Sequence, residues 1–162
     1  MGMLGTVINS LALKAAIEAH GMPARAMTAI EINKVAEPFI RGKALRHLEK
    51  GRIVIFGAGT GNQYFTTDTA AALRAAEIGA EVLIKATKVD GLYDKDPAKF
   101  KDAVFIEKTT YQDAISRKLR VMDMTALSLC EENRLPIKIL NIFKEGNIYR
   151  GVMEEGTGSL VS

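Results

Sequence analysis

Several residue types that mark particular classes of protein are scarce in this chain. It has one cysteine, Cys130, so an intramolecular disulfide is impossible and a reducing cytoplasm is the expected location. Its two histidines, His20 and His47, fall in separate predicted helices without the spacing of metal ligands. We therefore predict no metal site formed by protein side chains. No apolar run is long enough to cross a bilayer, so no membrane partner is expected.

Features typical of nucleic-acid binding are also few. The chain has six phenylalanines, four tyrosines and no tryptophan with which to stack bases. The net charge is +3, but the basic residues are scattered and form no run of four. We expect no nucleic-acid partner, whereas a small nucleotide would suit a mildly positive surface equally well.

What the chain does contain is an alternation of helical and strand patterns. Predicted helices that end at Gly21 and Gly79 are each followed by an apolar strand, which is typical of βαβ units. The prediction is an α/β fold with a mostly parallel sheet sandwiched by helices, in a single domain over residues 1–162. The expected helices are 4–19, 38–48, 67–78, 110–118, 124–133 and 148–153, and the expected strands are 24–32, 52–56, 81–86, 137–141 and 158–161.

The first residues resemble the middle of a buried helix. The run from Met1 to Leu13 is apolar at helical spacing, and no Ser, Thr, Asp or Asn precedes it as a cap. We therefore expect that a preceding segment has been removed.

The strongest motif is Gly57-Ala-Gly-Thr-Gly61, which follows an apolar strand and leads to the predicted helix near residue 67. Glycines there allow backbone N–H groups to approach an anion, and the start of a helix adds the positive end of its dipole. The hydroxyls of Thr66 and Thr67 add further donors. The segment predicts a phosphate-binding loop, with an ordinary tight turn and a helix cap as the alternative.

Two other phosphate-binding templates fit this motif poorly. A dinucleotide-binding turn has the spacing Gly-x-Gly-x-x-Gly, whereas this chain has Gly-x-Gly-x-Gly. The acid expected on the next strand is also misplaced, because Glu81 begins that strand and Asp90 lies too far along. A P-loop would need Gly-Lys-Ser or Gly-Lys-Thr after the glycines, which the sequence lacks.

A second polar segment follows the next strand, over residues 85–97. Thr87, Tyr93 and Asp96 offer a hydroxyl, an aromatic face and a carboxylate that could hold a nucleoside, although a solvated turn is the simpler interpretation. Farther along, Asp123 precedes a predicted helix and is by default an N-cap.

Taken in series, these segments resemble the bacterial UMP kinases, also called uridylate kinases. The resemblance rests on Gly57-Ala-Gly-Thr-Gly-Asn62, Phe65-Thr-Thr-Asp68, Lys85-Ala-Thr-Lys-Val-Asp-Gly91, Asp96-Pro97 and Val121-Met-Asp123, and it covers essentially the whole chain. It implies the amino-acid-kinase fold and transfer of the ATP γ-phosphoryl group to UMP, with Mg²⁺ accompanying ATP.

The resemblance also implies roles for particular residues. UMP would be held by Thr60, Gly61, Asn62, Gln63, Tyr64, Phe65, Thr66 and Thr67. ATP would be bound by Thr87, Tyr93 and Asp96; the catalytic acids would be Asp68 and Asp123. Lys14 and Arg25 match basic positions of a GTP effector site, but Glu18 replaces another residue that is often basic. Gln63 replaces a usual proline, so the turn is expected to be less rigid.

Other implications concern the parts of the family pattern that are missing here. Family members carry, ahead of the matching region, a lysine strand, two glycine loops and an aspartate for the UMP ribose. We therefore expect this polypeptide alone to be weak or inactive. The family is typically hexameric and regulated by GTP and UTP. The alternatives are a non-catalytic nucleotide-binding or subunit-interface module, and another amino-acid kinase such as a carbamate or acetylglutamate kinase.

Overall fold

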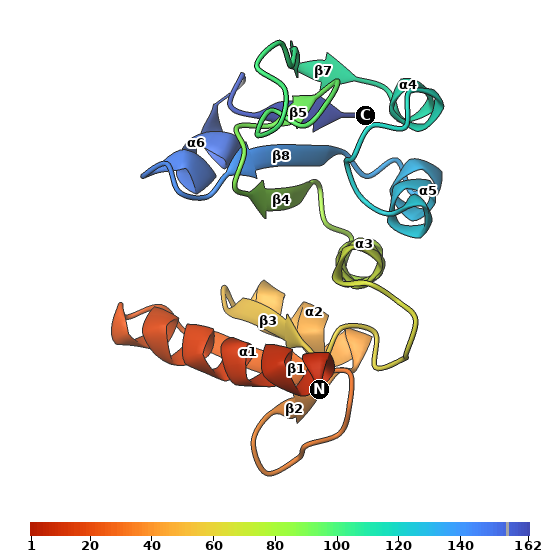
Figure 1. Ribbon diagram of the computed structural model, residues 1–162. Coiled ribbons are helices and arrows are strands. Elements are labelled where there is room, and N and C mark those ends of the chain that lie inside the picture. Colours follow the sequence, from red (N-terminus) through yellow and green to blue (C-terminus); the bar gives the residue numbers. More distant parts are fainter. Residues whose placement is uncertain (155) are drawn as a thin grey trace. The chain divides into compact units, whose positions relative to one another are not determined.

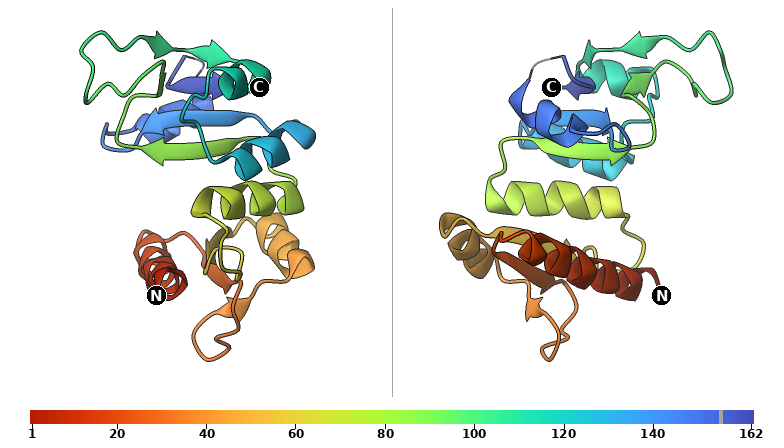
Figure 2. Two further views of the ribbon diagram at one scale, coloured as in Figure 1. Left: turned by 45° about the vertical axis from the view of Figure 1, so that its right-hand side comes forward. Right: turned by 90° about the vertical axis from the view of Figure 1, so that its left-hand side faces the viewer.

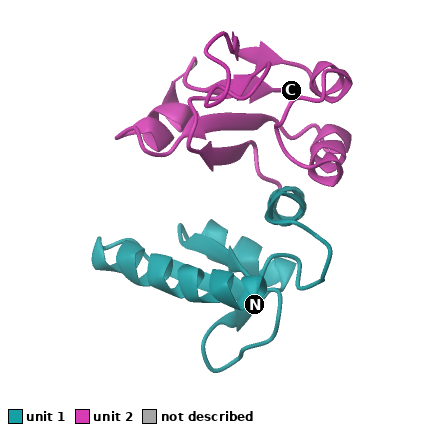
Figure 3. Cartoon of the chain, viewed as in Figure 1, with its two compact units in different colours: residues 1–78 teal, residues 79–162 magenta. Residues whose placement is uncertain are grey.

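The chain alternates helices and strands, as the glycine-punctuated pattern predicts. A computed structural model describes residues 1–154 and 156–162 (Figure 1). The chain divides into two compact units, Met1–Ile78 and Gly79–Ser162 (Figure 3). The α/β class with mainly parallel strands is confirmed. The expectation of a single domain over residues 1–162 remains a prediction.

The first unit is a three-stranded parallel sheet between helices. Its elements are α1 (Gly2–Ala19), β1 (Ala24–Thr28), β2 (Glu37–Pro38), α2 (Arg41–Glu49), β3 (Ile53–Gly57) and α3 (Thr67–Ile78), and the strand order is β2-β1-β3. Helix α1 packs on β1 and β3, and α2 packs on β3 from the other side of the sheet (Figure 2). In the register of β1 and β3, Thr28 lies beside Gly57, so the loops after both strands leave the same edge.

Two boundaries in the first unit differ from the prediction by more than two residues. Strand β1 ends at Thr28 rather than at residue 32, and its last side chain turns the backbone by donating a hydrogen bond to the carbonyl of Ile30 at 2.8 Å. Pro38 was expected to start a helix, but it lies in the edge strand β2. An edge position accepts proline because no ladder hydrogen bond from its nitrogen is required.

The second unit contains a mixed sheet and a short antiparallel pair. Its elements are β4 (Leu83–Thr87), β5 (Leu92–Tyr93), β6 (Phe105–Ile106), β7 (Lys108–Thr109), α4 (Tyr111–Ser116), α5 (Met124–Glu132), β8 (Ile137–Asn141), α6 (Asn147–Met153) and β9 (Ser159–Val161). The sheet order is β4-β8-β9-β7, and only β8 and β9 pair in antiparallel fashion. Strands β5 and β6 pair separately.

The three shortest strands of this unit, β5, β6 and β7, were not predicted. Each has two residues, too few for an alternating pattern, and each pairs with a distant part of the chain. The buried side chains of the unit include Ile137 and Leu140 of β8, Val161 of β9 and the thiol of Cys130. Burial raises the pKa of this thiol to about 11. Among the described residues, no helix has both the length and the apolar character needed to span a membrane.

Candidate functional site

The loop after β3 is shaped by its backbone conformation. Positive φ angles occur at Gly59 and Gly61, as the glycines suggest, and also at Ala58 and Tyr64, with φ of 66° and 70°. The N–H of Gly61 donates to the carbonyl of Ala58 at 3.0 Å, which closes a tight turn. A side chain at Gly61 would stand 3.0 Å from the carbonyl oxygen of Ala29, so this glycine allows the loops after β1 and β3 to touch.

The same loop ends in a capped helix. The hydroxyl of Thr66 accepts a hydrogen bond from the backbone N–H of Thr69 at 3.1 Å, which makes Thr66 the N-terminal cap of α3. Asp68 lies in the first turn of that helix, where a negative charge is favourable beside the helix dipole. The helix cap, which the sequence offered as the alternative to a phosphate-binding loop, is therefore present at Thr66.

A hollow of about 580 Å³ lies along this loop. Seven of the eight predicted UMP-binding residues line it, and Gly61 does not. The seven are Thr60, Asn62, Gln63, Tyr64, Phe65, Thr66 and Thr67. The N-terminal end of α1 and the residue before it form another part of the lining, through Met1, Gly2, Met3 and Thr6. Sequence reasoning missed these four residues, because their place beside the loop depends on how α1 packs.

The loop after β4 is held by side chains instead. The hydroxyl of Thr87 accepts from the N–H of Val89 at 3.2 Å and contacts the carbonyls of Val89 and Leu140 at 2.9 and 3.3 Å. Asp90 receives hydrogen bonds from Lys144 at 2.9 Å and from Asn141 at 3.0 Å. These two partners, Lys144 first, hold the pKa of Asp90 below its ordinary value of 3.8. Thr87 and Asp90 thus anchor the start of the loop.

Farther along this loop the packing is tight. The hydroxyl of Ser159 on β9 accepts from the N–H of Leu92 at 2.7 Å and donates to the carbonyl of Ile106 at 2.6 Å. A side chain on Gly91 would overlap Ser159 and the ring of Phe105. The rings of Tyr93 and Phe105 meet edge to face with centroids 5.4 Å apart. This packing fixes where the pair β5–β6 places Tyr93.

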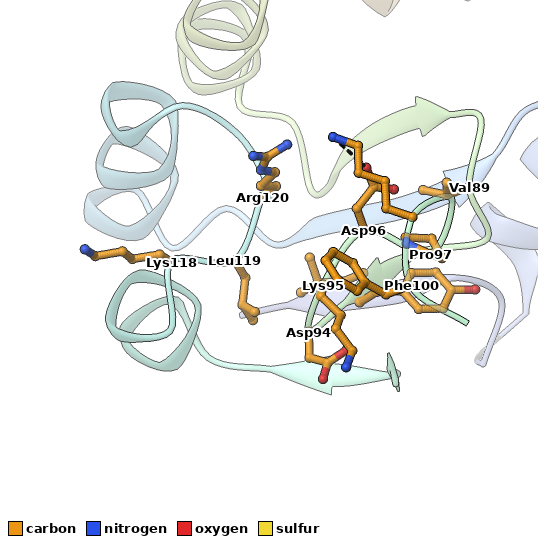
Figure 4. A pocket seen from close by; sticks show the side chains of 13 residues that line it. Val89, Asp94, Lys95, Asp96, Pro97, Phe100, Lys118, Leu119 and Arg120 are labelled. Carbon is orange, nitrogen blue, oxygen red and sulfur yellow. Dashed lines mark ion pairs between the residues drawn. The ribbon is translucent and has the colours of Figure 1, made fainter. Parts of the chain in front are cut away.

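A second hollow, of about 400 Å³, is lined in part by Tyr93. Figure 4 shows this hollow from close by, with Asp96, Phe100 and Arg120 on its lining. Of the predicted ATP-binding residues, Tyr93 and Asp96 line it, whereas Thr87 does not. The hydroxyl of Thr87 is hydrogen-bonded within the loop, to the carbonyl of Val89. Sequence reasoning missed Phe100 and residues 118–120 on the same lining. Residues 118–120 belong to the connection between α4 and α5, which no local pattern places near Tyr93.

The lining of this second hollow is more basic than acidic. It carries the cations Lys95, Lys99, Lys118 and Arg120, against the anions Asp94 and Asp96. Lys95 pairs with Asp102 at 2.6 Å, and Lys99 lies 4.0 Å from Asp96. Within the described residues no ion pair forms to Arg120, whose side chain extends from the α4–α5 connection in Figure 4. An unpaired guanidinium on a pocket wall is suited to bind an anionic group.

Asp123 lies just beyond that connection and caps a helix. Its carboxylate accepts from the N–H of Ala126 at 2.9 Å, which confirms it as the N-cap of α5. The preceding backbone is tied to β4, because the ammonium of Lys85 donates to the carbonyl of Val121 at 2.9 Å. Asp123 does not line the second hollow.

The two residues matched to a GTP effector site also lie together. Lys14 and Arg25 line a hollow of about 370 Å³ in the first unit. Both contact Glu18, at 3.2 and 3.5 Å, and Arg25 lies 3.8 Å from Glu37. These acids offset the positive charge that an anionic effector would need. Within residues 1–154 and 156–162, no three His, Cys, Asp or Glu side chains gather as a metal site.

Comparison with known proteins identifies the family. The amino acid kinase family model matches residues 1–141. The structure of UMP kinase from Bacillus anthracis matches with a TM-score of 0.96 and 38% identity, covering 99% of this chain and 67% of that one. UMP kinase from Ureaplasma parvum matches with a TM-score of 0.94 and 37% identity, covering 100% and 69%. Uridylate kinase from Archaeoglobus fulgidus matches with a TM-score of 0.71 and 29% identity, covering 99% of this chain and 70% of that one.

Proposed function

The chain belongs to the amino acid kinase family, and we propose that its reaction is transfer of the γ-phosphoryl group of Mg²⁺-ATP to UMP, giving UDP and ADP. The observation that carries the proposal is the hollow along the loop after β3, in a chain that is similar to two UMP kinases over its whole length. Both substrates are phosphate esters, and each of the two candidate loops offers groups that bind anions.

The first hollow is the proposed acceptor site. The side chains of Thr60, Asn62 and Thr67 supply hydroxyl and amide donors for UMP, and the twelve-residue helix α3 points the positive end of its dipole at the loop. The second hollow is the proposed donor site. Tyr93 and Phe100 offer aromatic surface to the adenine, and Arg120 offers charge to the phosphates.

Phosphoryl transfer requires little covalent chemistry from a protein. It requires the two phosphates to be aligned and the charge that builds up between them to be neutralised. Asp68, in the first turn of α3, and Asp123, at the N-cap of α5, are proposed to act in that alignment. Mg²⁺ enters with ATP as part of the substrate.

Regulation and assembly belong to the same proposal. A homo-oligomer in the cytoplasm that responds to UTP is expected from the family. A response to GTP is expected to be weak, because Glu18 lies between Lys14 and Arg25.

The test is a set of binding and turnover measurements. Calorimetry should detect UMP and ATP binding to the wild-type chain, and ³¹P NMR should detect slow UDP formation. Asn62→Ala should weaken UMP binding while ATP binding stays unchanged, and Tyr93→Ala should do the reverse. Asn9→Ala, an exposed asparagine on α1, is the matched control. A chain that binds UMP without any turnover would favour a nucleotide-binding module, and one that binds neither nucleotide would refute the proposal.

A further inference from the structure

The N-terminal part of α1 is hydrogen-bonded to the loop after β3 through the side chain of Thr6. The hydroxyl of Thr6 accepts a hydrogen bond from the backbone N–H of Ala58 at 2.9 Å, across 52 positions of sequence. The same hydroxyl donates to the carbonyl of Met3 at 2.7 Å, so both of its bonding directions are fixed. Thr6 also lines the hollow that holds Thr60 and Asn62.

Ala58 is the position at which the loop direction is set. It is the first residue after β3, it is completely buried, and its φ of 66° is unfavourable for a residue with a side chain. Its carbonyl accepts the hydrogen bond from Gly61 that closes the turn carrying Thr60. A buried N–H at this point needs a partner, and Thr6 provides it.

The next turn of α1 provides a comparison within the same helix face. Ser10 lies against Gly57, where an added side chain would stand 2.9 Å from the serine hydroxyl. The hydroxyl of Ser10, however, donates to the carbonyl of Val7 on its own helix. Ser10 therefore packs beside the loop, whereas Thr6 bonds to it.

We infer that Thr6 is a positioning residue for the acceptor loop. Its hydroxyl holds the Ala58 amide so that the turn presents Thr60 and Asn62 to the hollow. The nature of the ligand rests on the proposed function, but the positioning of the loop does not. Thr6 acts through Ala58 and need not touch the substrate.

The experiment compares Thr6→Val, Thr6→Ser and Ser10→Ala with the wild-type chain. Thr6→Val keeps the shape and removes the hydroxyl, so UMP binding should weaken about tenfold with ATP binding unchanged. Thr6→Ser restores the hydrogen bond and should bind UMP within about threefold of wild type, as should Ser10→Ala. Exchange of the Ala58 amide with solvent, followed by NMR, should accelerate in Thr6→Val alone.

Two affinity results would overturn the inference. One is wild-type UMP affinity in Thr6→Val; the other is Thr6→Ser losing affinity as Thr6→Val does, which would point to packing of the methyl group. If Thr6→Val does not fold, exchange of the Ala58 amide in other variants provides the test. Rapid exchange in the wild type would refute the inference. An Ala58 amide that is protected in the wild type and exchanges rapidly in Thr6→Ala would support it. If wild type binds no UMP, the proposed function fails, and the amide measurement still decides the role of Thr6.

Discussion

The two candidate ligand loops begin alike and are held in place differently. Each leaves the C-terminal end of a parallel strand, β3 in one unit and β4 in the other. The loop over residues 58–66 has four positive φ angles, whereas residues 88–100 have none. The second loop is fixed by side-chain hydrogen bonds: the hydroxyls of Thr87 and Ser159 accept from backbone N–H groups of the loop, and the amide of Asn141 donates to Asp90. Backbone conformation therefore shapes the first loop, which Thr6 also holds at Ala58, whereas the second loop depends on side-chain hydrogen bonds and packing.

The largest expected effect tests the packing of the second loop. Gly91→Ala places a methyl group against Ser159 and the ring of Phe105, and it should lower the free energy of unfolding by about 3 kcal/mol. Its φ is not positive, so the loss would come from contact and not from the backbone angle. Urea denaturation measures the change. Gly42→Ala, with open space around it, is the control and should leave stability unchanged or slightly higher.

The next effect tests the backbone of the first loop. Gly61→Ala forces a residue with a side chain to φ of 78° and against the carbonyl of Ala29, and it should cost about 2 kcal/mol. UMP affinity should fall as well. Gly51→Ala is the matched control, because it has a φ of 68° and open space, so it should show the backbone cost alone. Equal losses in the two variants would contradict contact between the loops after β1 and β3.

A smaller effect is expected at the anchor of the second loop. Thr87→Val removes the hydroxyl that bonds to Val89 and Leu140, and it should cost about 1 kcal/mol. Thr87→Ser keeps the hydroxyl and should recover most of the loss. Thermal unfolding and ATP titration of both variants provide the check. If Thr87→Val lowers ATP affinity without any loss of stability, Thr87 contacts the nucleotide directly and the anchor interpretation is wrong.

The smallest expected effect is a pH dependence at Asp90. Its folded-state pKa lies below the ordinary value because Lys144 and Asn141 bond to the carboxylate. The stabilisation is therefore present above the unfolded-state pKa and is lost as the pH falls through the folded-state pKa. Lys144→Met should raise the Asp90 pKa toward 3.8, as measured by NMR titration of the carboxyl carbon. An unchanged titration would show that the ion pair does not form in solution.

Local sequence patterns were sufficient for the long elements and for the first loop. Periodicity and bounding glycines predicted α1, α3 and β8 nearly to their ends, because those signals act over a few neighbouring residues. The spacing of Gly57, Gly59 and Gly61 after a strand likewise indicated a tight turn. The eight predicted UMP-binding residues came from the family resemblance, and seven of them line one hollow.

Long-range contacts decide the features of the two loops that local sequence patterns do not predict. Three such contacts join segments far apart in the chain: Thr6 beside Ala58, the packing that requires glycine at residue 91, and Arg120 on the lining of the second hollow. Local propensity carries no information on such pairs, since they form only when helices and strands pack. The amino acids thus determined the elements and the motif; the tertiary structure decided which side chains position the loops, because that choice depends on packing across the fold.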